Sequence, residues 1–174
     1  MTRVYVSIGS NIEREYNVRT GLAALRKCYG ELIVSSVYES KAWGFEGDNF
    51  YNLVVGFDTD DDVHVVATAL HTIEDQQGRV RSGPRYSART LDLDLLLYGD
   101  LVLREPGLML PRAEILKHAF VLLPLAEIAG QSRHPLNGRM YAELWQGFDL
   151  VGRELWVVPN RQMVAGKMSS VSSK

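Results

Sequence analysis

The first residues of the chain alternate between apolar and other side chains, a period that predicts a β-strand with one buried face over residues 3–8. Gly9 ends that pattern, and the spacing of apolar residues then changes. Over residues 16–29 they recur every three or four positions, which predicts an amphipathic helix. Gly30 follows directly and suits the left-handed conformation that ends many helices.

Two further stretches, residues 32–39 and 50–58, are rich in β-branched and aromatic side chains and predict strands. The loop 40–49 between them is too long for a tight hairpin and carries two aromatic residues, as binding loops often do. A second amphipathic helix is predicted between the acidic run 60–62, which supplies an N-cap, and Gly78.

The rest of the chain adds one long strand and a mixed C-terminal part. The elements that we expect there are a strand over 91–98, a short strand over 101–103, a helix over 113–129, a smaller helix over 141–145, a strand over 154–158 and a polar tail over 163–174. The order β-α-β-β-α-β predicts an α+β fold with a ferredoxin-like core, an antiparallel sheet with helices on one face. Additional C-terminal helices and strands then cover or extend that sheet. We expect residues 1–162 to form one domain.

Composition narrows the class of protein. With 174 residues, 46% of them hydrophobic, the chain can form a buried core. Cys28 is the only cysteine, which excludes an intrachain disulfide and a cysteine-based metal cluster and favours a cytoplasmic setting; we expect its side chain to be buried. The 19 basic and 21 acidic residues argue against a general nucleic-acid binder. Neither a signal peptide nor a membrane span is indicated.

Charge is nevertheless concentrated in one segment. Four arginines fall within residues 79–89, on a loop that also contains Gly and Ser. Because guanidinium groups match phosphate oxygens and stay charged at every working pH, the loop predicts a polyphosphate ligand. Ordinary surface ion pairs are the plainer interpretation, but they explain neither the density of the arginines nor the acids that follow.

Asp92 and Asp94 come next, on the predicted strand 91–98. A period of two places both carboxylates on one face and the neighbouring leucines on the other. Carboxylates so placed suit one or two Mg²⁺ ions that also bind substrate phosphates. A solvated strand face is the alternative, although two like charges repel each other without a cation. Glu74, on the last turn of the preceding helix, either meets an arginine or a ligand hydroxyl or is solvated.

Several landmarks of the sequence occur in the order typical of one family. They are residues 8–11 (IGSN), 34–38 (VSSVY), 51–52 (YN), 74–81 (EDQQGRVR), 89–94 (RTLDLD) and 120–128 (FVLLPLAEI). Over about residues 3–130 the chain therefore resembles the 6-hydroxymethyl-7,8-dihydropterin pyrophosphokinases of folate biosynthesis. RTLDLD is the most specific of these motifs.

The resemblance implies an ATP-dependent diphosphotransferase. Such an enzyme transfers pyrophosphate from ATP to the hydroxymethyl group of the pterin and releases AMP, with Mg²⁺, expected as two ions, as cofactor. ATP and a pterin are the partners that it implies, with no nucleic acid, no membrane and no obligate protein partner. Positioning and charge neutralisation carry this chemistry, which suits two metal ions and an arginine loop.

The resemblance also assigns roles residue by residue. It gives the metal to Asp92 and Asp94; catalysis to Arg79 and Arg89; ATP to Glu74, Arg81, Tyr86, Leu95, Arg112 and His118; and the pterin to Ser40, Trp43, Phe50, Asn52 and Phe120. Aromatic faces and an amide suit a flat heterocycle. By themselves, however, the two phenylalanines predict only ordinary core.

Three positions in the segment 111–120 depart from the family's pattern. Arg112 stands where histidine is usual, Ala113 where an aromatic residue or proline is frequent, and His118 where arginine is common. Because histidine is mostly neutral at pH 7, His118 would hold phosphate more weakly than arginine. A divergent paralogue with an altered acceptor or weakened ATP binding is therefore the first alternative. An RNA-binding ferredoxin-like domain is the second, although Asp92 and Asp94 would repel its ligand without a metal.

Overall fold

An antiparallel six-stranded sheet forms the centre of the computed structural model, which describes residues 1–41, 47–78 and 91–159. Its strands are β1 (Thr2–Ser10), β2 (Ile33–Val34), β3 (Tyr38–Ser40), β4 (Phe50–Thr59), β5 (Asp92–Tyr98) and β8 (Leu155–Val157). They lie in the order β5-β1-β4-β3-β8, with β2 also paired to β4. Every pairing in this sheet is antiparallel, as expected from the sequence.

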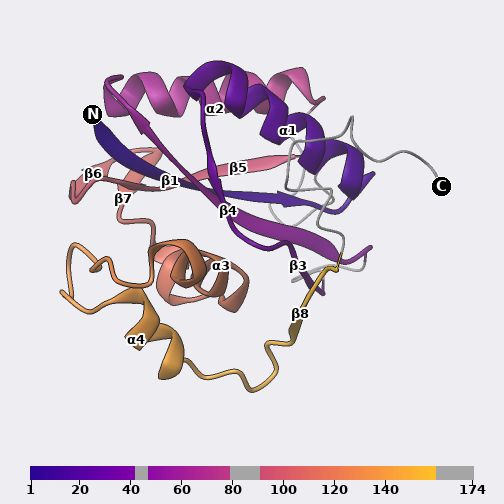
Figure 1. Ribbon diagram of the computed structural model, residues 1–174, viewed down its shortest axis with the longest axis vertical. Helices are drawn as coiled ribbons and strands as arrows, with labels where there is room; N and C mark the ends of the chain where they lie inside the picture. Colours follow the sequence, from indigo (N-terminus) through magenta and orange to yellow (C-terminus); the bar gives the residue numbers. More distant parts are fainter. Residues whose placement is uncertain (42–46, 79–90, 160–174) are drawn as a thin grey trace.

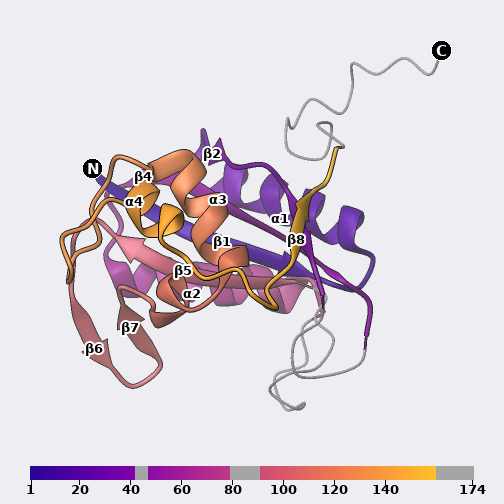
Figure 2. The ribbon, with the colours of Figure 1, turned by 90° about the horizontal axis from the view of Figure 1, so that it is seen from below.

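Helices cover both faces of the sheet. The helical elements are α1 (Arg14–Tyr29), α2 (Val63–Gln76), the 3₁₀ helix η1 (Ala113–Leu116), α3 (Ala119–Ala129) and α4 (Tyr141–Gln146). Figure 1 shows α1 and α2 on one side, here called the first face, and α3 and α4 on the other, the second face. The expectation of helices on one face holds for α1 and α2 and is wrong for the chain as a whole. Figure 2 shows α3 in front of the sheet and β8 at its edge, so the C-terminal part both covers and extends it.

The period of each strand divides the core into two clusters. On the first face, side chains such as Ile8, Leu53 and Leu93 pack beneath α1 and α2. On the second face, Tyr5 and Val54 pack against α3 and α4. Alternate residues of the same strands supply the two clusters, so a single sheet packs against helices on both of its faces.

Two predicted strands differ from the structure. The stretch 32–39 is split into β2 and β3, because the Ser35 hydroxyl accepts a hydrogen bond from the Val54 N–H at 2.9 Å and interrupts the regular ladder. The short strand 101–103 is displaced: β6 (Leu103–Glu105) pairs with β7 (Leu108–Leu110) as a separate two-stranded sheet.

The predicted helix 113–129 is broken into η1 and α3. His118 adopts an extended conformation, and its carbonyl accepts hydrogen bonds from the N–H groups of Val121 and Leu122 in the first turn of α3, both at 3.0 Å. His118 is therefore the N-cap residue of α3 rather than part of one long helix. Cys28, expected to be buried, is exposed on α1.

A carboxylate joins α3 to the sheet. Glu127 accepts hydrogen bonds from the Tyr38 hydroxyl at 2.7 Å and from the N–H and hydroxyl of Ser36 at 2.9 and 3.0 Å. Burial and this carboxylate raise the pKa of Tyr38 above its ordinary value. These bonds fix the C-terminal turn of α3 against the β2–β3 segment. Across the described ranges, none of the helices has the length and apolar character needed to cross a membrane.

Candidate functional site

Among the described residues, α3 and α4 pack on the second face against side chains such as Tyr5 and Val54 and leave the end of this face where β1 finishes, here called the open face, without a covering helix. Asp94 lies opposite Ser7 and Asp92 opposite Gly9 across the β5–β1 pair, and Gly9 lies opposite Asn52 across the β1–β4 pair. Residues directly opposite each other in an antiparallel pair point to the same face. The two carboxylates and the Asn52 amide therefore share one face with Val54, which contacts the α3 layer.

Gly9 keeps the space between the aspartates and Asn52 clear. A Cβ atom at this position would lie 3.4 Å from Asn52 Oδ1 and 3.9 Å from Phe50 Cδ1. Asn52 is buried, and its Nδ2 donates to the Ser40 hydroxyl at 2.7 Å, which fixes the orientation of the amide. Phe50 and Ser40 pair across β4 and β3. Three residues assigned to the pterin, Ser40, Phe50 and Asn52, are thus brought together.

The aspartates form a centre of negative charge. Burial and the adjacent Asp92 raise the pKa of Asp94 to about 7, and Arg112 opposes that shift. Arg112 Nη2 lies 3.4 Å from Asp94 Oδ1, and its Nε lies 3.0 Å from Glu114 Oε2. Arg112 is therefore beside the aspartates, as the sequence predicts for a phosphate contact, while Glu114 is a neighbour that no motif indicated.

The chemistry of this pair fits Mg²⁺. Among residues 1–41, 47–78 and 91–159, no group of three or more His, Cys, Asp or Glu side chains is placed to hold a metal ion. Mg²⁺ commonly uses one or two carboxylates and completes its octahedron with water and substrate phosphates. Two partly buried carboxylates on an open face suit that mode of binding rather than a closed protein cage.

Glu74 lies behind β5 and is buried. Its Oε2 accepts a hydrogen bond from the Leu93 N–H at 2.8 Å, so it satisfies a backbone donor on the edge strand of the sheet. The solvated alternative for Glu74 is therefore wrong. Its charge also helps to raise the pKa of Asp94. Leu95 is likewise apart from the open face, because its side chain is buried in the core of the first face.

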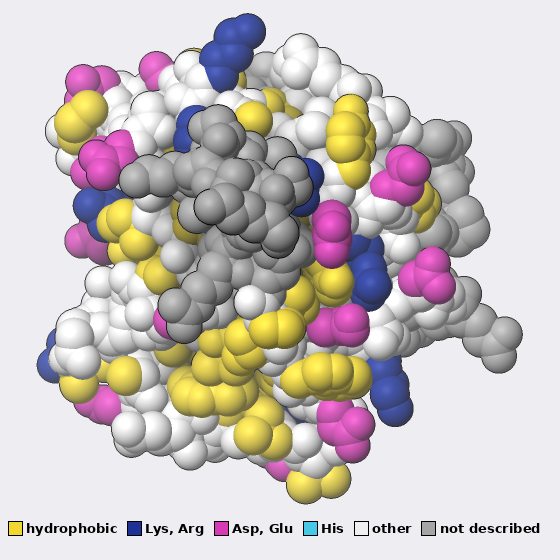
Figure 3. All heavy atoms as spheres, turned by 45° about the vertical axis from the view of Figure 1, so that its right-hand side comes forward, with side chains coloured by type: hydrophobic (Ala, Val, Ile, Leu, Met, Phe, Trp, Pro, Cys, Tyr) yellow, Lys and Arg dark blue, Asp and Glu magenta, His cyan; other side chains and the backbone are white. Residues whose placement is uncertain are grey.

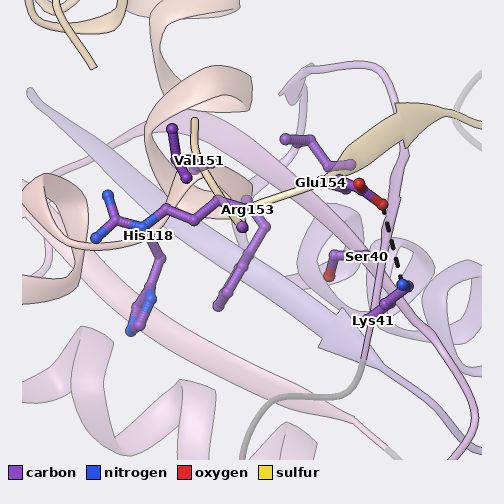
Figure 4. Close-up of a pocket in the computed structure, with 10 residues that line it drawn as sticks. Ser40, Lys41, His118, Val151, Arg153 and Glu154 are labelled. Atoms are coloured by element: carbon purple, nitrogen blue, oxygen red, sulfur yellow. Dashed lines mark ion pairs between the residues drawn. The ribbon is translucent and has the colours of Figure 1, made fainter. Parts of the chain in front are cut away.

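A pocket of about 470 Å³ lies beside the open face, at the start of α3. The rings of His118 and Phe120 are stacked with centroids 4.8 Å apart, and both residues line the pocket with Ser40. Burial lowers the pKa of His118, which keeps the imidazole neutral near pH 7. Figure 4 shows Ser40 and Lys41 on one side, His118 on the other, and residues 151–154 crossing the opening.

The segment 151–155 is the part of this pocket that sequence reasoning missed. It lines the pocket with Arg153 and Glu154, but it carries no motif and lies far from the other site residues in the sequence. Figure 3 shows hydrophobic side chains gathered in the lower half of the molecule, where Figure 1 places α3, α4 and β8. The remaining predicted site residues, Trp43, Arg79, Arg81, Tyr86 and Arg89, lie outside the described residues.

Several known proteins similar to this chain are pyrophosphokinases by name. A family model described as 7,8-dihydro-6-hydroxymethylpterin-pyrophosphokinase (HPPK) matches residues 5–130. A 2-amino-4-hydroxy-6-hydroxymethyldihydropteridine pyrophosphokinase of Pseudomonas aeruginosa is 39% identical over 146 residues, which are 82% of this chain and 89% of the relative. The protein of the same name from Aquifex aeolicus is 33% identical over 138 residues, 78% of this chain and 86% of the relative.

Solved structures show the same fold at lower identity. A Plasmodium falciparum HPPK-DHPS crystal structure with pteroate superposes with a TM-score of 0.65 and 14% identity. The match covers 83% of this chain but 42% of the solved one, so this chain spans less than half the length of that protein. The likeness concerns the fold of the shared part.

Proposed function

This chain belongs to the HPPK family, and we propose from that premise how its residues carry the transfer of pyrophosphate from ATP to the hydroxymethyl group of 6-hydroxymethyl-7,8-dihydropterin. The observation that carries the proposal is the row across the second face, where Asp92, Gly9 and Asn52 lie opposite one another. A phosphate-binding centre and a heterocycle-binding amide are thus neighbours on one surface.

Asp92 and Asp94 hold Mg²⁺, expected as two ions, at the β5 end of this row. When bound, the metal neutralises phosphate charge and orients the β-phosphorus for attack. Arg112 adds a permanent positive charge beside Asp94 and contacts the ATP phosphates. His118, which lies between η1 and α3, also belongs to the ATP site. Arg79, Arg81, Tyr86 and Arg89 complete the ATP site from their loop. Leu95 contributes through its main chain, since its side chain is in the core.

The pterin lies at the β3–β4 end of the row, between Phe50 and Phe120. Asn52 reads its polar edge, because the bond from Nδ2 to Ser40 holds the amide in one orientation with Oδ1 toward Gly9. Trp43 belongs to the rim of the same pocket. The hydroxymethyl oxygen attacks the β-phosphorus, the bond between the β-phosphorus and the α,β-bridging oxygen breaks, and AMP leaves with that oxygen. Holding both reactants on one rigid sheet supplies the required proximity.

Glu74 acts from behind the strand rather than by touching the nucleotide base. Its bond to the Leu93 N–H fixes the main chain between the two aspartates, and its charge helps to raise the pKa of Asp94. We assign it to the ATP site in this indirect sense.

Four finer assignments accompany the proposal. The strand order β5-β1-β4-β3 supports a ferredoxin-like core within the α+β fold. We place residues 1–162 in one domain and the protein in the cytoplasm. ATP and the pterin are its partners.

The direct test incubates the protein with Mg²⁺, ATP and 6-hydroxymethyl-7,8-dihydropterin and measures AMP and the pterin diphosphate. We expect AMP release to require both the pterin and Mg²⁺, and to be almost lost in Asp92→Ala. Asp100→Ala, which removes an exposed carboxylate from the turn after β5, is the matched control and should keep wild-type activity.

Two results would contradict the proposal. ATP binding without pterin-dependent AMP release would favour a paralogue with another acceptor. RNA binding that weakens with salt and needs no Mg²⁺ or ATP would favour the RNA-binding alternative.

A further inference from the structure

The outer wall of the pocket comes from a part of the chain beyond the family match. The match ends at residue 130, whereas residues 151–155 line the pocket opposite His118 and Phe120. β8, which begins at Leu155, pairs with β3 and so anchors this segment to the sheet beside Ser40. Regular pairing therefore anchors the wall to the sheet at Leu155, its C-terminal end.

Arg153 is held in place within this wall by its own neighbours. Its Nη1 donates to the Asp149 carbonyl at 3.0 Å, and its guanidinium carbon lies 5.1 Å from the centre of the Phe148 ring. These contacts use part of the guanidinium fork and leave further N–H donors. Figure 4 shows the side chain extended across the pocket toward the side where His118 lies.

The charge of Arg153 is not balanced inside the pocket. Lys41 and Glu154 pair with each other, with Nζ and Oε2 3.9 Å apart. Within the described ranges, no carboxylate forms an ion pair with Arg153, and the neighbouring His118 is neutral near pH 7. Among the described residues that line the pocket, positive charges therefore exceed negative charges by one, which favours an anionic ligand group.

The acceptor pterin cannot provide that anionic group, because its hydroxymethyl group is uncharged. Besides AMP, the reaction involves two larger phosphate esters, the polyphosphate of ATP and the diphosphate of the pterin product. We propose that Arg153 is a further binding residue of this enzyme and that it holds a phosphate ester from the C-terminal side of the pocket. Arg153 thereby distinguishes charged ligands from the uncharged acceptor. This inference rests on the proposed function.

The test measures binding of three ligands separately by titration calorimetry: Mg-ATP, the pterin alcohol and the pterin diphosphate. In Arg153→Gln we expect at least one phosphate ester to lose affinity by about tenfold or more, as for a lost charge-assisted hydrogen bond. The affinity for the alcohol should stay within about twofold. The ligand that loses affinity identifies whether the donor or the product is held.

Two further variants separate a phosphate contact from a general effect of charge. Lys117 is exposed and next to His118 in the sequence, but it does not line the pocket. The variant Lys117→Gln therefore removes a nearby positive charge and should bind all three ligands as wild type does. Arg153→Lys should recover part of the lost affinity, because it restores the charge without the planar fork.

The outcomes distinguish this inference from the proposed function. Unchanged affinity for both phosphate esters in Arg153→Gln, or an equal loss for all three ligands, overturns the role of Arg153. If the wild-type protein binds Mg-ATP but neither pterin, the proposed function fails, and the Mg-ATP titration alone then decides whether Arg153 holds phosphate.

Discussion

The two faces of the sheet differ in what covers them. The first face is closed along its length by α1 and α2 over a cluster of aliphatic and aromatic side chains. Among the described residues, α3 packs on the second face against side chains such as Tyr5 and Val54, and the same face also carries carboxylates, an amide and a hydroxyl. Packing is therefore concentrated on one side and chemistry on the other.

In the strand β5, neighbouring residues take part either in core packing or in the site. Leu93 and Leu95 point into the first face, and Asp92 and Asp94 point to the second. The register shift beside Tyr5 and Val6 then places both Leu96 and Leu97 in the α3 layer. Because one backbone carries both sets, substitutions one position apart should affect either stability or activity. The predictions below test that separation.

The largest effect is expected at Asp94. Asp94→Asn removes a proposed metal ligand, and we expect kcat/KM to fall by about 10²–10³-fold or more in the AMP assay. Its melting temperature without Mg²⁺ should be no lower than that of wild type near pH 8. The raised pKa of Asp94 means that wild-type stability decreases as pH rises through about 7, and asparagine avoids that ionisation.

Leu93, one position earlier, should show the opposite result. Its side chain is buried in the first-face core, so Leu93→Ala should reduce the free energy of unfolding by about 2–5 kcal/mol. Chemical denaturation measures this loss, and kcat per folded molecule should remain close to wild type. Val102→Ala, at an exposed apolar residue, is the control and should change stability by less than about 0.5 kcal/mol. A Leu93→Ala protein that is stable but inactive would break the separation of the two faces.

The sequence predicted the first face better than the second. Periodicity located α1, α2, β1, β4 and β5, because a continuous apolar stripe repeats at a fixed spacing. It failed at β2–β3 and at η1–α3, where the Ser35 hydroxyl and the His118 carbonyl make bonds that interrupt regular structure. Such side-chain and capping bonds depend on partners distant in sequence, which a local pattern cannot supply.

For the site, alternation along β5 and the motifs indicated Asp92, Asp94 and Asn52. Pairing across β1 was needed to show that they form one row, since register is a property of the folded sheet. The role of Arg153 had no local signal, because only the pairing of β8 with β3 brings its segment to the pocket.

The smallest effect concerns the polar contacts of the layer on the second face. His134 is buried beside Tyr141, and its Nδ1 accepts hydrogen bonds from the N–H groups of Leu136 and Asn137 at 3.2 and 3.3 Å. These bonds require Nδ1 to be unprotonated, and burial lowers the pKa of His134 below its ordinary 6.5. The unfolded chain therefore takes up this proton first, and stability decreases as pH falls below about 6.5.

His134→Asn isolates this contribution, because its Oδ1 can accept the same hydrogen bonds without titrating. Urea unfolding between about pH 5 and 8 should show that wild type loses more stability on acidification than His134→Asn. At neutral pH, His134→Ala should cost about 0.5–1.5 kcal/mol, since two part-buried hydrogen bonds lose their acceptor. If the unfolding free energies of wild type and His134→Asn change with pH in parallel, His134 does not make the stability of the second-face layer depend on pH. A steeper wild-type curve would show that polar bonds, as well as apolar packing, hold that layer in place.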